Sequence, residues 1–252
     1  MRVIQLSQSD DREAWLEERR AKITGTKFDK IAPLRYKRDG TTTPTGFWDL
    51  LAEFVSVAPD SNKKSLDRGH EVERNATLEA IRLLGLDIVD VNLDPGMWVS
   101  DNEHIALSPD AAQMGDRPTF AIEDKCFDSG KHLRTVFFDL VSKRIDDQGF
   151  IAALPPVVFD ILPDIPSMYN PINSVPKENR SQAKHYFVVN PHLKVLYFVL
   201  HDDRIALPEL ETYVITINRE DIEEEVFIQK YTAEKQLDAI FETLKTLTSG
   251  LH

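Results

Sequence analysis

The sequence predicts an α/β protein in which a mixed sheet is flanked by helices, and three observations carry that prediction. Helical patterns recur through the first 84 residues, short strand-like segments crowd into 87–127, and the tail 220–247 is helical again. Helices on both sides of a run of strands are typical of a sheet covered on its faces. No internal repeat and no convincing boundary divides the 252 residues, so we expect a single domain, 1–252.

Three short helices are expected before residue 60. A capping-box pattern starts the first, over about 11–20. Thr24-Gly25-Thr26 then resembles the cap of a second helix, over 27–32. A third helix is predicted through 47–57.

The clearest helical pattern spans about 66–84. Its apolar stripe consists of Val72, Ala76, Ala80, Leu83 and Leu84. Gly85 follows directly and is suited to end the helix, because glycine readily adopts the left-handed conformation found there. Strand-like segments come next, at 87–91, 98–100, 104–108 and 119–127.

Later segments are less regular. The stretch 151–178 holds six of the 14 prolines among apolar residues, which predicts an ordered insertion or lid. On propensity alone, 186–202 indicates two strands around Asn190-Pro191, and 212–218 indicates one more.

Composition excludes several classes of protein. The single cysteine cannot form an internal disulfide or hold an iron–sulphur cluster, and the N-terminus lacks the apolar stretch of a secretion signal. No apolar run is long enough to span a bilayer, so we expect a soluble, cytoplasmic protein.

The net charge of -12 is unevenly distributed along the chain. Residues 12–38 carry nine Lys/Arg against four acids, whereas 201–252 carry five against twelve. A local basic region can hold phosphates even when the total charge is negative, so DNA is not excluded as a partner.

The chemistry suggested by the sequence centres on a strand that ends in charges. In the predicted strand over 119–127, alternate residues share a face, so Glu123 and Lys125 point the same way. Asp110 precedes them by a connection short enough to lie alongside. Two carboxylates so placed repel each other unless a cation lies between them, and oxygen ligands suit Mg²⁺ or Mn²⁺. The alternative is a turn at Asp110 and a surface ion pair.

Three further features carry weaker signals. Glu73 lies beside the apolar stripe of the 66–84 helix, although a glutamate there is usually only solvated. The amides and hydroxyls of Thr24-Gly25-Thr26, preceded by Arg19 and Arg20, are suited to a phosphate, although such a motif is more often only a cap. Gln182 and Tyr186 lie one turn apart if their segment is helical.

In this order, the motifs resemble those of the lambda-exonuclease type (YqaJ-like viral recombinase) branch of the PD-(D/E)XK nucleases. The resemblance runs through most of the chain. Its elements are Trp15…Arg19-Arg20-Ala-Lys-Ile-Thr-Gly-Thr26, Arg-Gly-His-Glu-Val-Glu73, Ser-Pro-Asp110, Ile-Glu123-Asp-Lys125-Cys and Gln182. Each element alone is weak, but elements in register make a chance match improbable.

This resemblance implies a restriction-endonuclease-like core and a site for Mg²⁺, with one or two ions and with Mn²⁺ as a substitute. Asp110 and Glu123 would be direct metal ligands, together with the backbone carbonyl of Asp124. Glu73 would hold a metal-bound water or a second ion.

The remaining site residues also follow from the resemblance. Lys125 would position and activate the attacking water, and Gln182 would help order the site. Arg19 and Thr26, with Arg20 and Thr24 beside them, fall where the family binds the 5'-terminal phosphate.

Members of this family degrade one strand of linear duplex DNA from its 5' end, form ring-shaped trimers and work beside a single-strand annealing protein. The expected activity is therefore a 5'→3' exonuclease on double-stranded DNA with 5'-phosphate ends, serving phage-type homologous recombination in the bacterial host cytoplasm. An endonuclease or RecB-like repair nuclease with the same core is the alternative, and an inactive DNA-binding relative is a second one.

Three features depart from the family pattern. The segment 151–178 is longer and richer in proline than the expected connection. The family places a helix after Gln182 where propensity favours a strand, and we follow the family through about residue 188. Asp124 stands where the family has an apolar residue and faces away from Glu123, so it needs a partner that the sequence does not name.

Overall fold

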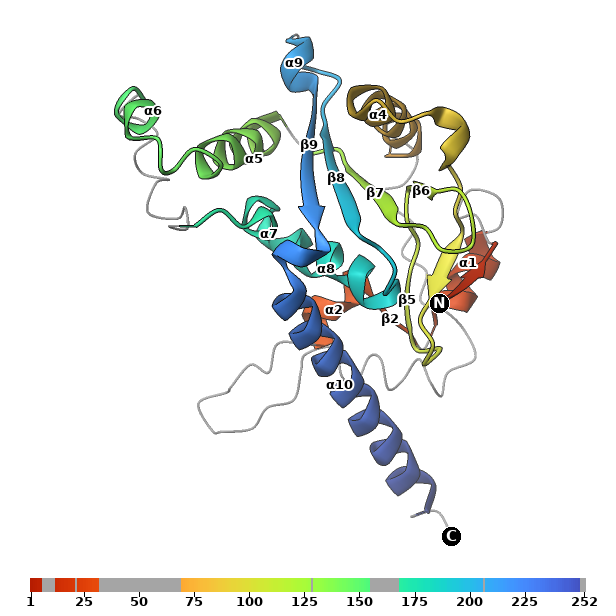
Figure 1. Cartoon of the computed structure of the whole chain (residues 1–252). Coiled ribbons are helices and arrows are strands. Elements are labelled where there is room, and N and C mark those ends of the chain that lie inside the picture. The colour runs from red at the N-terminus through yellow and green to blue at the C-terminus, as the bar shows by residue number, and fades with distance from the viewer. Residues whose placement is uncertain are drawn as a thin grey trace.

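A computed structural model describes residues 1–5, 12–20, 22–31, 69–127, 129–154, 168–205 and 207–249, with the side chains of 29–31 and 69–71 left out. It confirms the predicted fold class, because two mixed sheets are flanked by helices (Figure 1). Among the helices in these ranges, none is both long and apolar enough to cross a membrane.

The larger sheet has five strands in the order β3-β6-β7-β8-β9. Their bounds are β3 Val91–Asn92, β6 Ala111–Gln113, β7 Phe120–Lys125, β8 Val195–His201 and β9 Thr212–Asn218. The central strands β7 and β8 run parallel, and every other neighbouring pair is antiparallel. Charged residues at the end of β7 therefore lie next to the buried end of β8.

The smaller sheet has the order β1-β4-β5-β2. It consists of β1 Arg2–Ile4, β4 Met97–Val99, β5 Ile105–Leu107 and β2 Ile23–Thr24. Strands β4 and β5 form a hairpin, and β2 pairs with β5 in parallel. This pairing holds the start of the Thr24-Gly25-Thr26 segment against the body of the protein.

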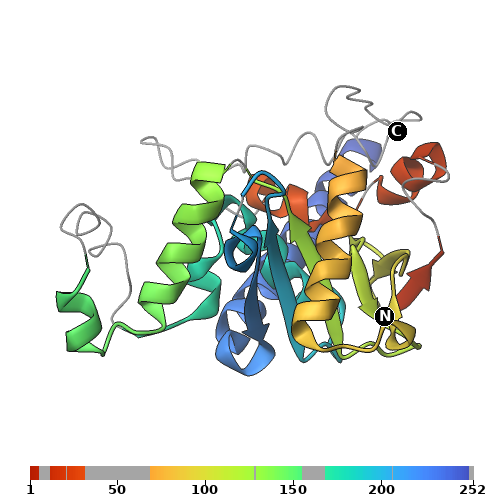
Figure 2. The same ribbon diagram turned by 90° about the horizontal axis from the view of Figure 1, so that it is seen from above.

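Helices cover both faces of the larger sheet. Their bounds are α1 Arg12–Arg19, α2 Gly25–Ile31, α4 Gly69–Leu84, α5 Ser129–Ser142, α6 Gln148–Ala152, α7 Pro171–Ser174, α8 Arg180–Val189, α9 Pro208–Glu211 and α10 Glu223–Ser249. Helix α4 lies on one face of the sheet, with α8 and α10 on the opposite face, and the far end of α10 projects away from the sheets (Figures 1 and 2).

Alternation along the central strands separates two apolar layers. Ile122 and Val199 face α4, where they pack with Ala80 and Ile81. Ala121 and the alternate residues of β8 face the opposite way, into the larger core shared with α8, α10 and the smaller sheet. Because Glu123 follows Ala121 by two residues and Asp124 follows Ile122 by two, the two acids leave β7 on opposite faces.

Most predicted elements are confirmed. Helices form at 12–19, 25–31, 69–84 and 223–249, and the strand over 212–218 has the predicted bounds. Gly85 ends α4 with a φ of 63°, as expected for a C-terminal glycine. The predicted helix over 47–57 and the first residues of the 66–84 helix lie outside the described ranges.

Some predictions were wrong. Residues 88–90 form a 3-10 turn rather than a strand, because the Asp87 carboxylate accepts a hydrogen bond from the Val89 amide and caps the turn. Leu83 is 48% exposed, and Ile81 takes its place in the core. By contrast, the helix that the family resemblance predicts through about residue 188 is confirmed, because α8 runs to Val189. It buries Phe187 and Val188 in the larger core, where packing outweighs strand propensity.

The proline-rich segment is partly described. Its ends contain the last residues of α6 and all of α7, where Asn170 caps the helix and Pro171 occupies its first turn. Residues 155–167 lie outside the described ranges. A 3-10 turn, Lys177–Asn179, then leads into α8.

Candidate active site

The predicted pair Glu123 and Lys125 meets on one face of β7. Glu123 is 2% exposed, and its carboxylate forms an ion pair with the Lys125 ammonium. The same ammonium donates to the backbone carbonyl of Asp124 over 3.1 Å. Lys125 thus contacts two of the groups that were predicted to bind a metal ion.

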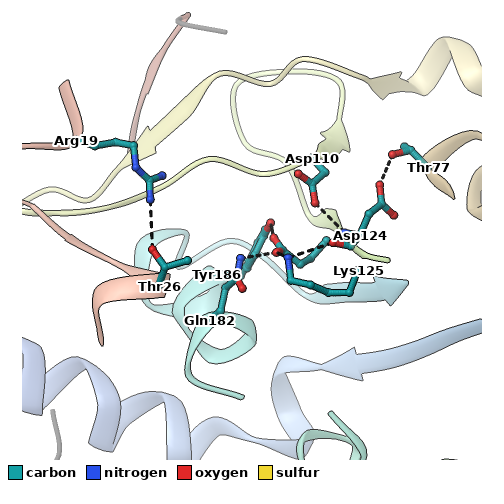
Figure 3. Close-up of polar contacts among 9 residues, drawn as sticks. Arg19, Thr26, Thr77, Asp110, Asp124, Lys125, Gln182 and Tyr186 are labelled. Atoms are coloured by element: carbon teal, nitrogen blue, oxygen red, sulfur yellow. Dashed lines mark hydrogen bonds and ion pairs between the residues drawn. The ribbon is translucent and has the colours of Figure 1, made fainter. Parts of the chain in front are cut away.

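Asp110 reaches this cluster from the neighbouring strand. It immediately precedes β6, which pairs with β7 so that Ala111 lies opposite Ile122. The Asp110 carboxylate accepts a hydrogen bond of 2.7 Å from the backbone amide of Asp124, as Figure 3 shows. The Pro-Asp turn therefore brings Asp110 to the charged end of β7, as expected.

The acids of the cluster outnumber its one ammonium group, Lys125, and their pKa values reflect this crowding. Burial raises the pKa of Asp110 well above its usual range, and the charge of Glu123 raises it further. Burial lowers the pKa of Lys125, but the charges of Glu123 and Asp110 outweigh that effect and raise it overall. Both shifts favour a cation at this place.

Two residues of α8 hold Glu123 from the other side. The Gln182 amide donates to one carboxylate oxygen of Glu123, and the Tyr186 hydroxyl donates to the other. Their spacing of one helical turn places both on the same face of α8. Tyr186 is 1% exposed and had no assigned role; its spacing from Gln182 was the signal that could have found it.

Glu73 lies in the second turn of α4 and is partly buried. Its charge contributes to raising the pKa of Asp124 and of Lys125, so the carboxylate lies near the end of β7. The structure therefore brings together the five residues predicted to be catalytic: Glu73, Asp110, Glu123, Lys125 and Gln182.

The donors present suit a hard divalent ion such as Mg²⁺ or Mn²⁺. Two carboxylates and one carbonyl, from Asp110, Glu123 and Asp124, offer oxygen only. Within the described ranges no three His, Cys, Asp or Glu side chains are grouped as a metal site, so the Asp124 carbonyl is needed to complete the set. The Lys125 ammonium, bound to two of these donors, shows that the cluster accommodates a positive charge.

The predicted phosphate site forms around Arg19, at the end of α1. Its guanidinium lies 4.2 Å from the centroid of the Trp15 ring and 3.5 Å from the exposed Thr26 hydroxyl (Figure 3). Ser108 accepts a hydrogen bond of 3.1 Å from the Trp15 indole and lies 3.5 Å from Arg19. Because Ser108 precedes Asp110 by two residues, the site adjoins the acid cluster.

The two other predicted phosphate ligands have different surroundings. Thr24 is fully buried, and its hydroxyl lies 3.2 Å from the Thr26 hydroxyl, so it supports Thr26 and is closed to solvent. Arg20 forms an ion pair with Glu17 on α1. The structure thus groups Arg19 with Thr26, and it pairs Arg20 with an acid of its own helix.

Gly25 lets the phosphate site approach α8. A Cβ atom at Gly25 would lie 3.1 Å from Gln182 Cγ, 3.2 Å from Gln182 Cα and 3.4 Å from His185 Cβ. Only a residue without a side chain leaves α2 and α8 at this separation without displacement. One helix therefore contacts both the acid cluster and the Thr24-Gly25-Thr26 turn.

Comparison with solved structures shows a likeness in fold to a known protein. The chain aligns with an alkaline exonuclease, LHK-Exo, from Laribacter hongkongensis at a TM-score of 0.62, covering 95% of this chain and 100% of that chain. It shares the fold of that exonuclease. LHK-Exo in complex with dAMP aligns with a TM-score of 0.59, and sequence identity is 18% in both comparisons. No protein-family model and no curated protein matches the sequence.

Proposed function

We propose that the protein is a metal-dependent exonuclease that degrades one strand of linear double-stranded DNA in the 5'→3' direction. The observation that carries the proposal is the contact of one helix, α8, with two sites. Gln182 bonds Glu123 of the acid cluster, and its backbone packs against Gly25 beside the Arg19–Thr26 site. A phosphate held at the second site would place the following bonds of the strand near the first.

The acid cluster would bind one or two Mg²⁺ ions, for which Mn²⁺ substitutes. Asp110, Glu123 and the Asp124 carbonyl are the ligands in this proposal, and Glu73 holds water at the same place. Such an ion neutralises charge on a scissile phosphate and lowers the pKa of a water molecule. Gln182 and Tyr186 fix the orientation of the Glu123 carboxylate, so that it presents its oxygen atoms in one direction.

Lys125 would act as a cation in this reaction. Because its pKa is raised, its side chain carries a proton at neutral pH and donates hydrogen bonds. An ammonium so placed orients a water molecule and stabilises the negative charge that develops on phosphate oxygens. Arg19 and Thr26 would hold the 5'-terminal phosphate by charge-assisted hydrogen bonds.

The biological setting belongs to the same proposal. By family resemblance the protein would form a ring-shaped homo-trimer, leave 3' single-stranded tails and pass them to a single-strand annealing recombinase of phage-type recombination in the bacterial cytoplasm. Exposed apolar residues on α10 support self-association, since Phe227 is 69% and Tyr231 54% exposed.

One experiment tests the activity and its direction. The substrates are linear duplexes with a label at the 5' or the 3' end, carrying either a 5'-phosphate or a 5'-hydroxyl, and circular duplex DNA without nicks. Each is incubated with Mg²⁺ and, separately, with EDTA. We expect Mg²⁺-dependent loss of the 5' label first, with the phosphorylated end preferred and the circle intact. Cutting of the circle would identify an endonuclease instead, and no release from any substrate would identify an inactive DNA-binding relative.

A further inference from the structure

Asp124 is a buried acid that the proposed chemistry does not use, apart from its backbone carbonyl. Its side chain is 2% exposed and lies on the α4 face of β7, beyond the apolar layer of Ile122 and Val199. A buried carboxylate in such a layer costs free energy unless hydrogen bonds compensate it. The burial of the Asp124 carboxylate therefore needs a structural explanation.

The partner of Asp124 is Thr77, on α4. The Thr77 hydroxyl donates to one carboxylate oxygen of Asp124, and Figure 3 shows the two side chains pointing toward each other. The other carboxylate oxygen of Asp124 is buried and has no hydrogen-bond partner among the described residues. One hydrogen bond thus accounts for the position of this side chain.

Thr77 is also tied to Glu73. Its hydroxyl lies 3.1 Å from the backbone carbonyl of Glu73, one helical turn earlier. The same hydroxyl is therefore within hydrogen-bond distance of both β7 and the turn of α4 that carries Glu73. Two contacts of the Thr77 hydroxyl, with Asp124 and with the Glu73 carbonyl, therefore join strand β7 to the turn of α4 that carries Glu73.

We propose that Asp124 is a positioning residue: by holding Thr77, it fixes the turn of α4 that presents Glu73 to the end of β7. The inference rests on the proposed function, in which Glu73 serves the metal site. In this proposal the Asp124 side chain binds neither substrate nor metal and acts only through Thr77 and Glu73.

Four variants separate the hydrogen bond from the charge. Asp124→Asn and Thr77→Ser keep the acceptor and the hydroxyl, whereas Asp124→Leu and Thr77→Val remove them. Thr135→Val is the matched control, because the buried Thr135 hydroxyl donates to the carbonyl of Lys131 one turn earlier on a different helix, α5. It removes the same helical contact without touching Asp124.

The measurements are kcat and KM on linear duplex, and the Kd for Mn²⁺ without DNA. Asp124→Leu and Thr77→Val should each lower kcat and weaken Mn²⁺ binding by about tenfold, as is usual when a supporting contact of a metal site is removed. The KM for DNA should stay within about twofold. Asp124→Asn and Thr77→Ser should recover most of the loss, and Thr135→Val should behave as wild type.

Combining Asp124→Leu with Glu73→Gln decides whether the effect passes through Glu73. We expect the double variant to bind Mn²⁺ no more weakly than the weaker-binding single variant. Both substitutions remove the same contribution to Mn²⁺ binding, that of the Glu73 carboxylate. Additive losses would overturn the proposal, as would wild-type kcat and Mn²⁺ affinity in Asp124→Leu. Equal losses in Asp124→Asn and Asp124→Leu would show that charge matters and would also overturn it.

Failure of the proposed function is distinguishable from failure of this inference. If wild type bound no Mn²⁺ and released no nucleotides, the proposed function would be wrong. Amide hydrogen exchange would then test whether Asp124 fixes the turn of α4 that carries Glu73. Faster exchange of the amides over 73–77 in Asp124→Leu, with Thr135→Val unchanged, supports it. Unchanged exchange over 73–77 overturns it.

Discussion

Acidification should destabilise this protein through one buried histidine, His185 on α8. Its side chain is fully buried, packs against Phe28 with 5.9 Å between ring centroids, and bonds the Ile23 carbonyl over 3.1 Å. Burial lowers the pKa of His185 to about 4, although its backbone hydrogen bonds oppose the shift. In the unfolded chain the imidazole regains an ordinary pKa.

The sign and size of the effect follow from these two pKa values. Between pH 6.5 and about 4 the unfolded chain binds a proton that the folded chain does not, so the free energy of unfolding falls as pH falls. The full loss, below pH 4, is about 3 kcal/mol. About 1 kcal/mol of it is already lost between pH 7.5 and 5.5.

Urea unfolding at pH 7.5 and 5.5 measures this loss. We would stay above pH 5.5, because the sequence pI of 5.1 favours association at lower pH. Asp110 and Asp124 have raised pKa values and contribute with the opposite sign, so wild type is compared with His185→Gln, in which both acids remain. The difference between the two proteins isolates His185.

Wild type should lose about 1 kcal/mol more of its free energy of unfolding than His185→Gln over this interval. The exposed His192 provides the control, since His192→Gln should follow wild type. If His185→Gln and wild type lost the same free energy, protonation of the buried imidazole would not be the cause, and the argument from burial would be refuted.

Three further predictions concern the two sites. Lys125→Ala should retain Mn²⁺ and DNA binding but lower kcat by at least about 100-fold. The reason is that it removes the ammonium group that stabilises the negative charge developing on the phosphate oxygens. A single-turnover rate equal to that of wild type would remove Lys125 from the mechanism. Arg19→Ala should reduce the preference for a 5'-phosphate over a 5'-hydroxyl end by about tenfold or more. Arg144→Ala is the control, because Arg144 forms an exposed ion pair with Asp147 and is assigned to neither site. An unchanged preference in Arg19→Ala would place the phosphate elsewhere. Asp110→Asn should raise the free energy of unfolding at pH 7 in EDTA, because the ionised acid is disfavoured in the folded state. Mn²⁺ at about 100 times its Kd should stabilise wild type by about 2.7 kcal/mol but not Asp110→Asn in thermal melts.

Local signals in the sequence predicted much of the fold. Helix α4 and its end at Gly85, strand β9 and helix α10 all follow from periodicity and end residues. A 3-10 turn forms after Asp87 where a strand was predicted, because one hydrogen bond, from the Val89 amide to the Asp87 carboxylate, stabilises the turn. Strands of two or three residues, such as β2, are too short for any periodicity to show.

The site needed information from outside each local segment. Family resemblance, and not propensity, correctly made the residues after Gln182 a helix, whose buried face is decided by packing against the larger core. The partner of Asp124 lies 47 residues away, and the bond from Tyr186 to Glu123 spans 63 residues. No spacing rule within one element predicts such pairs, because they depend on how α4 and α8 pack on the two faces of one sheet.

The contact of α8 with both the acid cluster and Gly25 has a consequence for the size of the nucleotide fragment that the proposed reaction releases. A strand anchored by its terminal phosphate would meet the acid cluster at one fixed distance, since the same residue, Gln182, bonds Glu123 and lies against Gly25. We therefore expect every cycle to release a fragment of constant length. A flexible joint between the two sites would instead yield a ladder of sizes.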